Sequence, residues 1–226
     1  MVKNLKGVIN LKRGAIFDMD GTLFDTEKLY RLAWIETADT FGVERKPEIA
    51  AEMSGRSVEK ILVTIPQFFP EVDANEYFKR VVTRVRKEIE EKLEIKQGVV
   101  EILNFFKENK IPMAIASSSE TEDIKNNIKR TGISQFFDEI VGGDQVQNGK
   151  PAPDIFILAA KKINLQPEDC YVFEDSANGI RAAHAANCVP IMVVDQAPPL
   201  PDIRKICAGI FSSMENALDA IKNGKI

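Results

Sequence analysis

The sequence has few of the residues on which several classes of enzyme depend. It contains one histidine, His184, and three cysteines among 226 residues. The cysteines (Cys170, Cys188 and Cys207) form no Cys-x-x-Cys pair, so the sequence favours neither a zinc site nor a disulfide framework. His184 lies between two pairs of alanines, which is typical of a packing or surface residue. A nucleophile-histidine-carboxylate triad would have to use this one histidine and is therefore disfavoured.

Long apolar runs and an excess of basic residues are also absent. No segment approaches the roughly 20 apolar residues of a membrane helix, and the first six residues are too polar for a secretory signal. We therefore expect a cytoplasmic protein that does not bind membranes. The net charge of -4 does not favour binding to nucleic acid. No unusually apolar surface stretch stands out, so we expect a monomer.

The pattern from residue 96 onward predicts an α/β fold. Short β-branched runs alternate there with amphipathic segments, as in a parallel sheet with crossover helices. Strands are predicted at residues 15–17, 112–116, 139–141, 171–173, 191–194 and 209–211. Helices are predicted at residues 99–109, 120–130, 154–163, 177–186 and 214–223. We expect a Rossmann-like, doubly wound sheet that forms a core from residues 1–27 and 96–226.

Residues 28–95 break this alternation. They show helical periodicity throughout and contain no convincing strand. Asp73 with Glu76 has the spacing of a capping box, which predicts the start of a long helix. The sequence therefore predicts an inserted helical domain at residues 28–95.

Residues 14–26 carry the clearest chemical signal, because an apolar strand ends there in Asp18 and Asp20. Alternate side chains of a strand point the same way, so both carboxylates can face one site. Mg²⁺ suits such a pair, since it takes carboxylate and carbonyl oxygens, and Gly21 lets backbone amides approach a phosphate. One acid can attack phosphorus while the other transfers protons. Aspartates that merely cap a strand-to-turn junction would account for either acid but not for the cluster.

Three later strands also run into polar residues at their carboxyl ends or in the following loop. These positions are Ser117, Lys150 in a proline-flanked loop, and Glu174 with Asp175. A serine hydroxyl can bind a phosphate oxygen, a lysine can neutralise phosphate and carboxylate, and further acids can hold a metal. Each signal alone has an ordinary alternative, namely a helix cap, a solvated lysine or a turn. Ligands of open α/β sheets bind beyond the carboxyl ends of the strands, so we expect these residues to converge.

Because these motifs occur together and in this order, the sequence resembles the haloacid dehalogenase superfamily, in the branch that contains β-phosphoglucomutases and sugar-phosphate phosphatases. The resemblance covers nearly the whole chain. It implies that Asp18 is the nucleophile, that Asp20 is the general acid and base, and that residues 28–95 form a cap. It also implies that Ser117 binds phosphate and that Lys150 neutralises charge.

The resemblance further implies a Mg²⁺ cofactor. The expected ligands are the Asp18 side chain, the Asp20 backbone carbonyl and Asp175. Glu174 would be either a direct ligand or a partner of the ligands. The implied enzyme is a phosphoric monoester hydrolase that acts on a small phosphorylated metabolite, with a sugar phosphate as the expected class, through an aspartyl-phosphate intermediate.

Two residues, Asp20 and Tyr30, distinguish a phosphatase from the other activities of this superfamily. Dehalogenases lack the second acid of the first motif, and a leaving halide needs no proton, so Asp20 favours phosphoryl transfer. A β-phosphoglucomutase-type mutase stays as an alternative, although Tyr30 stands where that branch has a histidine, which favours water as the acceptor. Arg56 is a candidate for binding phosphate or sugar hydroxyls, or else an ordinary surface arginine. The third alternative is a non-catalytic module that binds a phosphorylated ligand.

Overall fold

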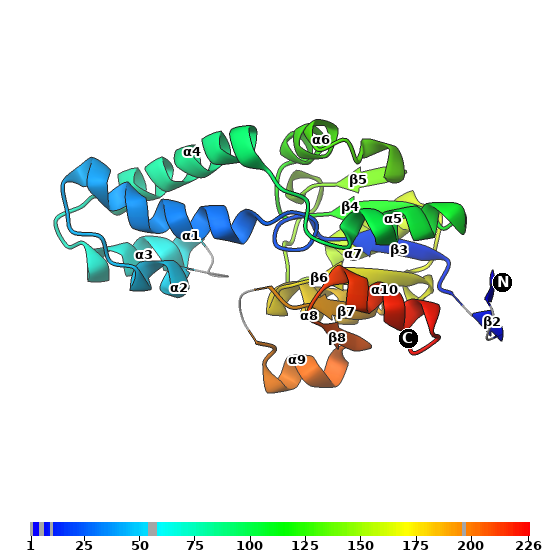
Figure 1. Cartoon of the computed structure of the whole chain (residues 1–226). Coiled ribbons are helices and arrows are strands. Elements are labelled where there is room, and N and C mark those ends of the chain that lie inside the picture. Colours follow the sequence, from blue (N-terminus) through cyan, green and yellow to red (C-terminus); the bar gives the residue numbers. More distant parts are fainter. Residues whose placement is uncertain (1, 5–6, 10, 54–57, 196–197) are drawn as a thin grey trace. The chain divides into compact units, whose positions relative to one another are not determined.

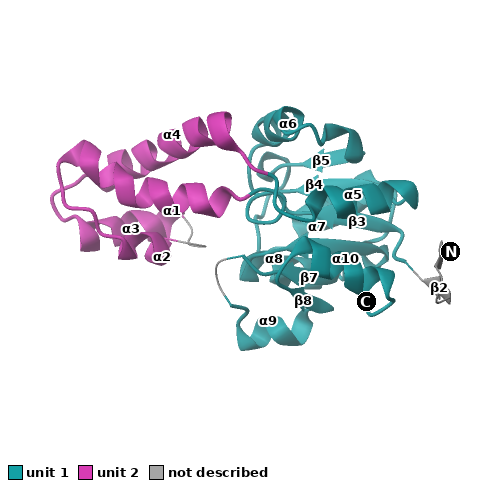
Figure 2. Cartoon of the chain, in the orientation of Figure 1, with its two compact units in different colours: residues 1–24, 95–226 teal, residues 25–94 magenta. Residues whose placement is uncertain are grey.

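The computed structural model spans residues 1–226 and describes all of them except residues 1, 5–6, 10, 54–57 and 196–197. The chain divides into two compact units (Figure 2). Unit 1 comprises residues 1–24 and 95–226, and unit 2 comprises residues 25–94. Among the described helices, none combines the length and the apolar character that crossing a membrane would require.

Unit 1 is built on a sheet of six parallel strands (Figure 1). The strands are β3 (Gly14–Phe17), β4 (Met113–Ala116), β5 (Glu139–Val141), β6 (Cys170–Glu174), β7 (Val189–Val193) and β8 (Gly209–Phe211). Their spatial order is β5-β4-β3-β6-β7-β8, so the chain builds outward from β3 on one side and then returns to build outward on the other. This order confirms the predicted α/β class with a doubly wound parallel sheet.

The four central strands, β3, β4, β6 and β7, are buried on both faces because helices cover both. Ile16 and Val172 belong to one buried cluster with residues of α7 (Asp154–Lys162) and α8 (Ala177–Ala185). The neighbouring side chains point the opposite way: the Phe17 ring stacks on Phe173 at a centroid distance of 4.7 Å and meets Phe106 edge-on at 6.2 Å. Phe106 lies on α5 (Val99–Glu108), which packs beside α10 (Met214–Lys222). Continuous apolar runs are typical of strands buried in this way.

Several further elements complete unit 1. α6 (Thr121–Arg130) contacts β5, and short 3-10 turns occupy Ser134–Phe136, Gly143–Gln145 and Pro167–Asp169. Three elements were not predicted from the sequence: helix α9 (Pro201–Ile206) and the strands of an antiparallel pair, β1 (Val2–Asn4) and β2 (Gly7–Ile9). All three are short, and short elements give too few periods for a pattern to emerge.

Unit 2 is helical in its described residues. It contains α1 (Thr26–Glu36), a 3-10 turn (Thr37–Phe41), α2 (Glu48–Met53), α3 (Val58–Phe68) and α4 (Ala74–Lys92). The Asp73 side chain caps α4 by accepting a hydrogen bond of 2.8 Å from Glu76 N. At the centre of the unit, Tyr77 stacks on Trp34 and donates its hydroxyl to the Trp34 carbonyl at 2.7 Å. Burial raises the pKa of Tyr77, so this hydroxyl stays a donor.

Candidate active site

The candidate site begins where the order of the strands reverses, between β3 and β6. The parallel register pairs Phe17 with Phe173, so the residues that follow them, Asp18 and Glu174, emerge side by side. Asp18 N donates to the Phe173 carbonyl at 3.0 Å, which ties the first residue after β3 to β6. This reversal point is where open α/β sheets bind ligands.

Lys150 brings the ends of three strands together. Its Nζ donates to Asp18 Oδ1 at 2.5 Å, to Glu174 Oε1 at 2.7 Å and to the Ala116 carbonyl at 3.2 Å. The same nitrogen lies 5.1 Å from the centre of the Phe156 ring. Only 7% of the lysine side chain is exposed, so both ion pairs are shielded from water. Lys150 comes from the loop before α7 and is the cation of this cluster.

Glu174 is held at both of its oxygens. Oε1 accepts from Lys150, while Oε2 accepts from Ser176 N at 2.8 Å and from Ser176 Oγ at 2.9 Å. The carboxylate packs onto the first turn of α8, where a Cβ added to Gly179 would lie 1.7 Å from Oε1. Only glycine fits at that position. These contacts hold Glu174 as an anchor for Lys150, a role that was not among the two expected from the sequence.

The acidic groups of this cluster outnumber its one ammonium group, that of Lys150. Burial raises the pKa of Asp18 to about 7, with the carboxylates of Glu174 and Asp20 acting in the same direction and Lys150 opposing them. Burial also acts to lower the pKa of Lys150, but the two carboxylates outweigh it, so the pKa of Lys150 is raised and the lysine stays charged. One ammonium therefore contacts two buried acids, with the partly buried Asp175 beside them, and this excess of acidic groups favours the entry of another cation.

Asp20 lies against the loop that follows β4. Ser119 Oγ donates to Asp20 Oδ2 at 2.9 Å, and Ser119 N donates to Ser117 Oγ at 3.2 Å. Ser117 is buried, and its oxygen already accepts one hydrogen bond, so its own O–H can serve as a donor to a phosphate oxygen. Ser119 was not singled out from the sequence. The run of three serines was the available signal, but it does not tell which hydroxyl meets which acid.

The turn after Asp20 packs directly on Asp175. Gly21 has a φ of 75°, in the left-handed region that favours glycine, and a Cβ there would lie 2.3 Å from Asp175 Oδ2. The next residue, Thr22, donates its hydroxyl to Asp175 Oδ1 at 3.3 Å. Gly21 is thus required for close packing as well as for the turn.

Three carboxylates of the site form a group suited to a hard cation. Asp18, Glu174 and Asp175 each offer an oxygen, and these atoms lie within 4.8 Å of one another. Carboxylate oxygens are what Mg²⁺ prefers, and it is often held by only one or two of them together with substrate phosphate. Both carboxylate oxygens of Glu174 already accept hydrogen bonds, three in all, which disfavours Glu174 as a direct metal ligand.

The profile of the family described as haloacid dehalogenase-like hydrolase matches residues 15–193, a span that runs from the second residue of β3 to the last residue of β7. The chain belongs to the haloacid dehalogenase-like hydrolases. Membership of this family, inferred above from four motifs, is thereby confirmed, and with it the expectation of a hydrolase.

Several curated relatives of this hydrolase carry the names of phosphatases. It is 36% identical to the "Phosphorylated carbohydrates phosphatase" of Thermotoga maritima over 76% of this chain and 80% of the relative. It is 32% identical to the fructose-1-phosphate phosphatase YqaB of Escherichia coli, over 76% of this chain and 92% of the relative. Among solved structures, a protein from Thermotoga maritima provisionally named as a β-phosphoglucomutase is 30% identical, with a TM-score of 0.81 over 93% of this chain and 99% of the other.

Of Tyr30 and Arg56, both discussed from the sequence, the structure of this haloacid dehalogenase-like hydrolase describes only Tyr30. Tyr30 is half-buried on α1 and packs against the apolar cluster of that unit. Arg56, the candidate for substrate binding, lies outside the described residues.

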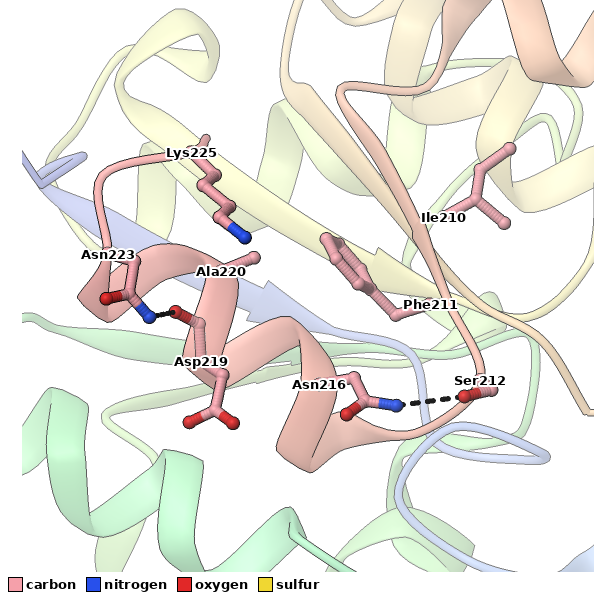
Figure 3. Close-up of a pocket in the computed structure, with 8 residues that line it drawn as sticks. All are labelled: Ile210, Phe211, Ser212, Asn216, Asp219, Ala220, Asn223 and Lys225. Atoms are coloured by element: carbon pink, nitrogen blue, oxygen red, sulfur yellow. Dashed lines mark hydrogen bonds between the residues drawn. The ribbon is translucent and has the colours of Figure 1, made fainter.

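A pocket of about 380 Å³ lies beside β8 and α10 of the hydrolase (Figure 3). Its lining includes Phe211, Asn216 and Lys225, and the Asn216 amide donates to Ser212 Oγ at 2.9 Å. None of the residues around Asp18 lines it. The chemical groups that the sequence predicts to work together are therefore elsewhere, at the carboxyl ends of β3, β4 and β6.

Proposed function

We propose that this hydrolase is a Mg²⁺-dependent phosphatase that cleaves a small phosphorylated metabolite, with a sugar phosphate as the expected class, by transferring the phosphoryl group to Asp18. The observation that carries the proposal is the contact between the buried carboxylate of Asp18 and Lys150, at 2.5 Å, beside Asp175 and Glu174. A buried acid at the reversal point of the sheet, paired with a cation and next to further acids, suits attack on a phosphate ester.

In the first step, an Asp18 oxygen forms a bond to phosphorus as the ester P–O bond breaks. Asp20 gives its proton to the departing oxygen, so the product leaves as an alcohol. In the second step, Asp20 takes a proton from water and the water oxygen bonds to phosphorus. The bond between phosphorus and the Asp18 oxygen breaks, which releases inorganic phosphate and restores the Asp18 carboxylate. The hydrogen bond from Ser119 would hold Asp20 in place for both proton transfers.

The groups around Asp18 would bind the phosphoryl oxygens. Ser117 supplies a hydroxyl donor, and Lys150 supplies a positive charge that stays in place through both steps. Asp18 and Asp175 would hold Mg²⁺ together with the Asp20 backbone carbonyl, and bound Mg²⁺ would offset the negative charge of the phosphate and carboxylates. These residues suit Mg²⁺ because three carboxyl groups, those of Asp18, Glu174 and Asp175, lie close together beside a single ammonium, that of Lys150.

The proposed substrate class follows the names of the curated relatives, which include phosphatases of phosphorylated carbohydrates and of fructose 1-phosphate. We propose that residues 25–94 serve as the cap that selects among such substrates. The cytoplasmic location and the monomeric state also stay predictions.

A second candidate function is that of a β-phosphoglucomutase-type mutase. One observation favours it, namely the solved structure of that provisional name at 30% identity. Against it, Tyr30 takes the position of the histidine that the mutase branch uses, and its half-buried side chain packs against the apolar cluster of unit 2. The two activities separate when β-glucose 1-phosphate is supplied with a bisphosphate primer: a mutase yields glucose 6-phosphate, whereas a phosphatase yields free phosphate.

The proposal is tested by hydrolysis of p-nitrophenyl phosphate with Mg²⁺ and with a chelator, followed by a panel of sugar phosphates ranked by kcat/KM. We expect activity that requires the metal and is lost in Asp18→Asn with the fold intact. Activity that survives in Asp18→Asn would overturn the assignment of the nucleophile. No hydrolysis under any condition would favour the alternative of a non-catalytic module that binds phosphorylated ligands.

A further inference from the structure

Lys96 lies just before the N-terminus of α5, and its side chain contacts the turn that follows Asp20. Its Nζ donates to the Gly21 carbonyl at 2.7 Å and to Asp195 Oδ1 at 2.7 Å. Its backbone N–H donates to the Leu23 carbonyl at 2.9 Å, so the residue contacts the turn at two points. The side chains of Lys96 and Asp195 are 18% and 10% exposed, and Lys96 is therefore not an ordinary solvated lysine.

The turn that Lys96 grips links two parts of the site. Gly21 is fixed at both of its backbone polar groups, because its N–H donates to the Phe24 carbonyl at 3.0 Å and its carbonyl accepts from Lys96. On one side of Gly21 is Asp20, and on the other is Thr22, whose hydroxyl donates to Asp175. A shift of the Gly21 peptide would thus move the proposed acid and base as well as the packing on Asp175.

We propose that Lys96 is a positioning residue, whose ammonium group, oriented by Asp195, fixes the Gly21 carbonyl and so holds Asp20 and Asp175 in register for the reaction. This inference rests on the proposed function. It assigns to Lys96 no contact with substrate or metal.

Asp195 explains why a lysine can serve in this place. It follows β7 and therefore lies at the same edge of the sheet as Asp18 and Glu174. Its Oδ1 neutralises Lys96, while its Oδ2 is buried and, in the part of the chain that the structure describes, has no hydrogen-bond partner. An ion pair alone would not require the lysine to meet a backbone carbonyl. The second acceptor, Gly21, is what connects the pair to the chemistry.

The test compares Lys96→Met, Asp195→Asn and the double variant with the wild type. Lys162→Met is the matched control, because Lys162 is also partly buried in unit 1 and also donates to a backbone carbonyl and a side-chain oxygen, but at β5. Three quantities are measured: kcat and KM for p-nitrophenyl phosphate, the melting temperature, and the rise of that temperature with added Mg²⁺. The last does not depend on turnover.

We expect Lys96→Met to lower kcat by about 10- to 100-fold with a much smaller change in KM, and to require more Mg²⁺ for the same rise in melting temperature. The double variant removes both charges, so it should recover the melting temperature lost when Asp195 is left unpaired, while kcat stays low because Gly21 still lacks its donor. Lys162→Met should keep the wild-type kcat. The inference is overturned if Lys96→Met retains full kcat, or if the double variant recovers kcat together with stability.

Failure of the proposed function is a distinct result. If the wild type hydrolyses no phosphate ester but is stabilised by Mg²⁺, the proposed function is wrong, and the Mg²⁺ titration tests Lys96 by itself. Loss of the stabilisation in Lys96→Met but not in Lys162→Met supports the positioning role of Lys96. Stabilisation of Lys96→Met equal to that of the wild type overturns that role. If the wild type shows neither hydrolysis nor stabilisation by Mg²⁺, both proposals fall.

Discussion

Replacement of Lys150 by methionine perturbs the candidate site at its centre. Methionine keeps most of the apolar stem but removes the ammonium that joins Asp18, Glu174 and the Ala116 carbonyl. Asp18 and Glu174 are then left as two buried acids that have lost their shared cation. Both are almost fully shielded from solvent, with 9% and 1% of their side chains exposed, so water cannot replace the lost partner.

The expected cost is large for this reason. Removal of one partner from a buried ion pair lowers the free energy of unfolding by about 3–5 kcal/mol, because the remaining charge is uncompensated. Lys150 also opposes the effect of burial on the pKa of Asp18, so its loss raises that pKa further above the normal range and protonates the proposed nucleophile. Together with the loss of a donor to the phosphoryl oxygens, we expect kcat to fall by at least about 100- to 1,000-fold.

Urea unfolding measures the first effect and p-nitrophenyl phosphate hydrolysis measures the second. A double variant, Lys150→Met with Glu174→Gln, also removes the buried charge of Glu174, while the amide oxygen of the new glutamine side chain can still accept from Ser176. It should recover much of the lost stability but none of the lost kcat. Lys162→Met serves as the control, with wild-type kcat. A Lys150→Met protein as stable and as active as the wild type would refute the reasoning.

The remaining predictions concern two contacts with the acidic residues of the site. Gly179→Ala should lower kcat by about 10- to 100-fold, because the new Cβ would lie 1.7 Å from Glu174 Oε1 and force that carboxylate away. Gly149→Ala is the control and should leave kcat unchanged, because nothing lies within 4 Å of its Cβ. Equal kcat values in the two variants would contradict this prediction. Ser119→Ala should lower kcat about 10-fold with little effect on KM or on melting temperature, because it deletes the hydrogen bond to Asp20, and an unchanged kcat would remove Ser119 from the proposed mechanism.

The sheet and the first layer of the site could be predicted from the sequence because both depend on local patterns. Apolar runs that end in polar residues located β3, β4 and β6, and the rule that ligands bind at the carboxyl ends of parallel strands brought Asp18, Ser117 and Asp175 together. The structure agrees on the sheet, and it places these residues around one reversal of strand order.

The contacts that support those residues could not be predicted in this way. Ser119 meets Asp20, and Lys96 meets Asp195, across 99 residues of sequence in each case. Such pairs depend on how loops pack and on which rotamer each side chain adopts, and neither leaves a periodic pattern. The role of Glu174 was open for the same reason, since only its hydrogen bonds to Lys150 and Ser176 show it as an anchor for Lys150.

The central claim is that Asp18 carries the phosphoryl group during turnover. The most direct measurement is rapid acid quenching of the enzyme during steady-state hydrolysis with Mg²⁺, followed by mass spectrometry of its peptides. We predict that the mass of one phosphoryl group is added to the peptide that contains Asp18, that it disappears when substrate is exhausted, and that it never forms in Asp18→Asn. Steady turnover with no phosphorylated peptide, or with the group on another residue, would contradict the account.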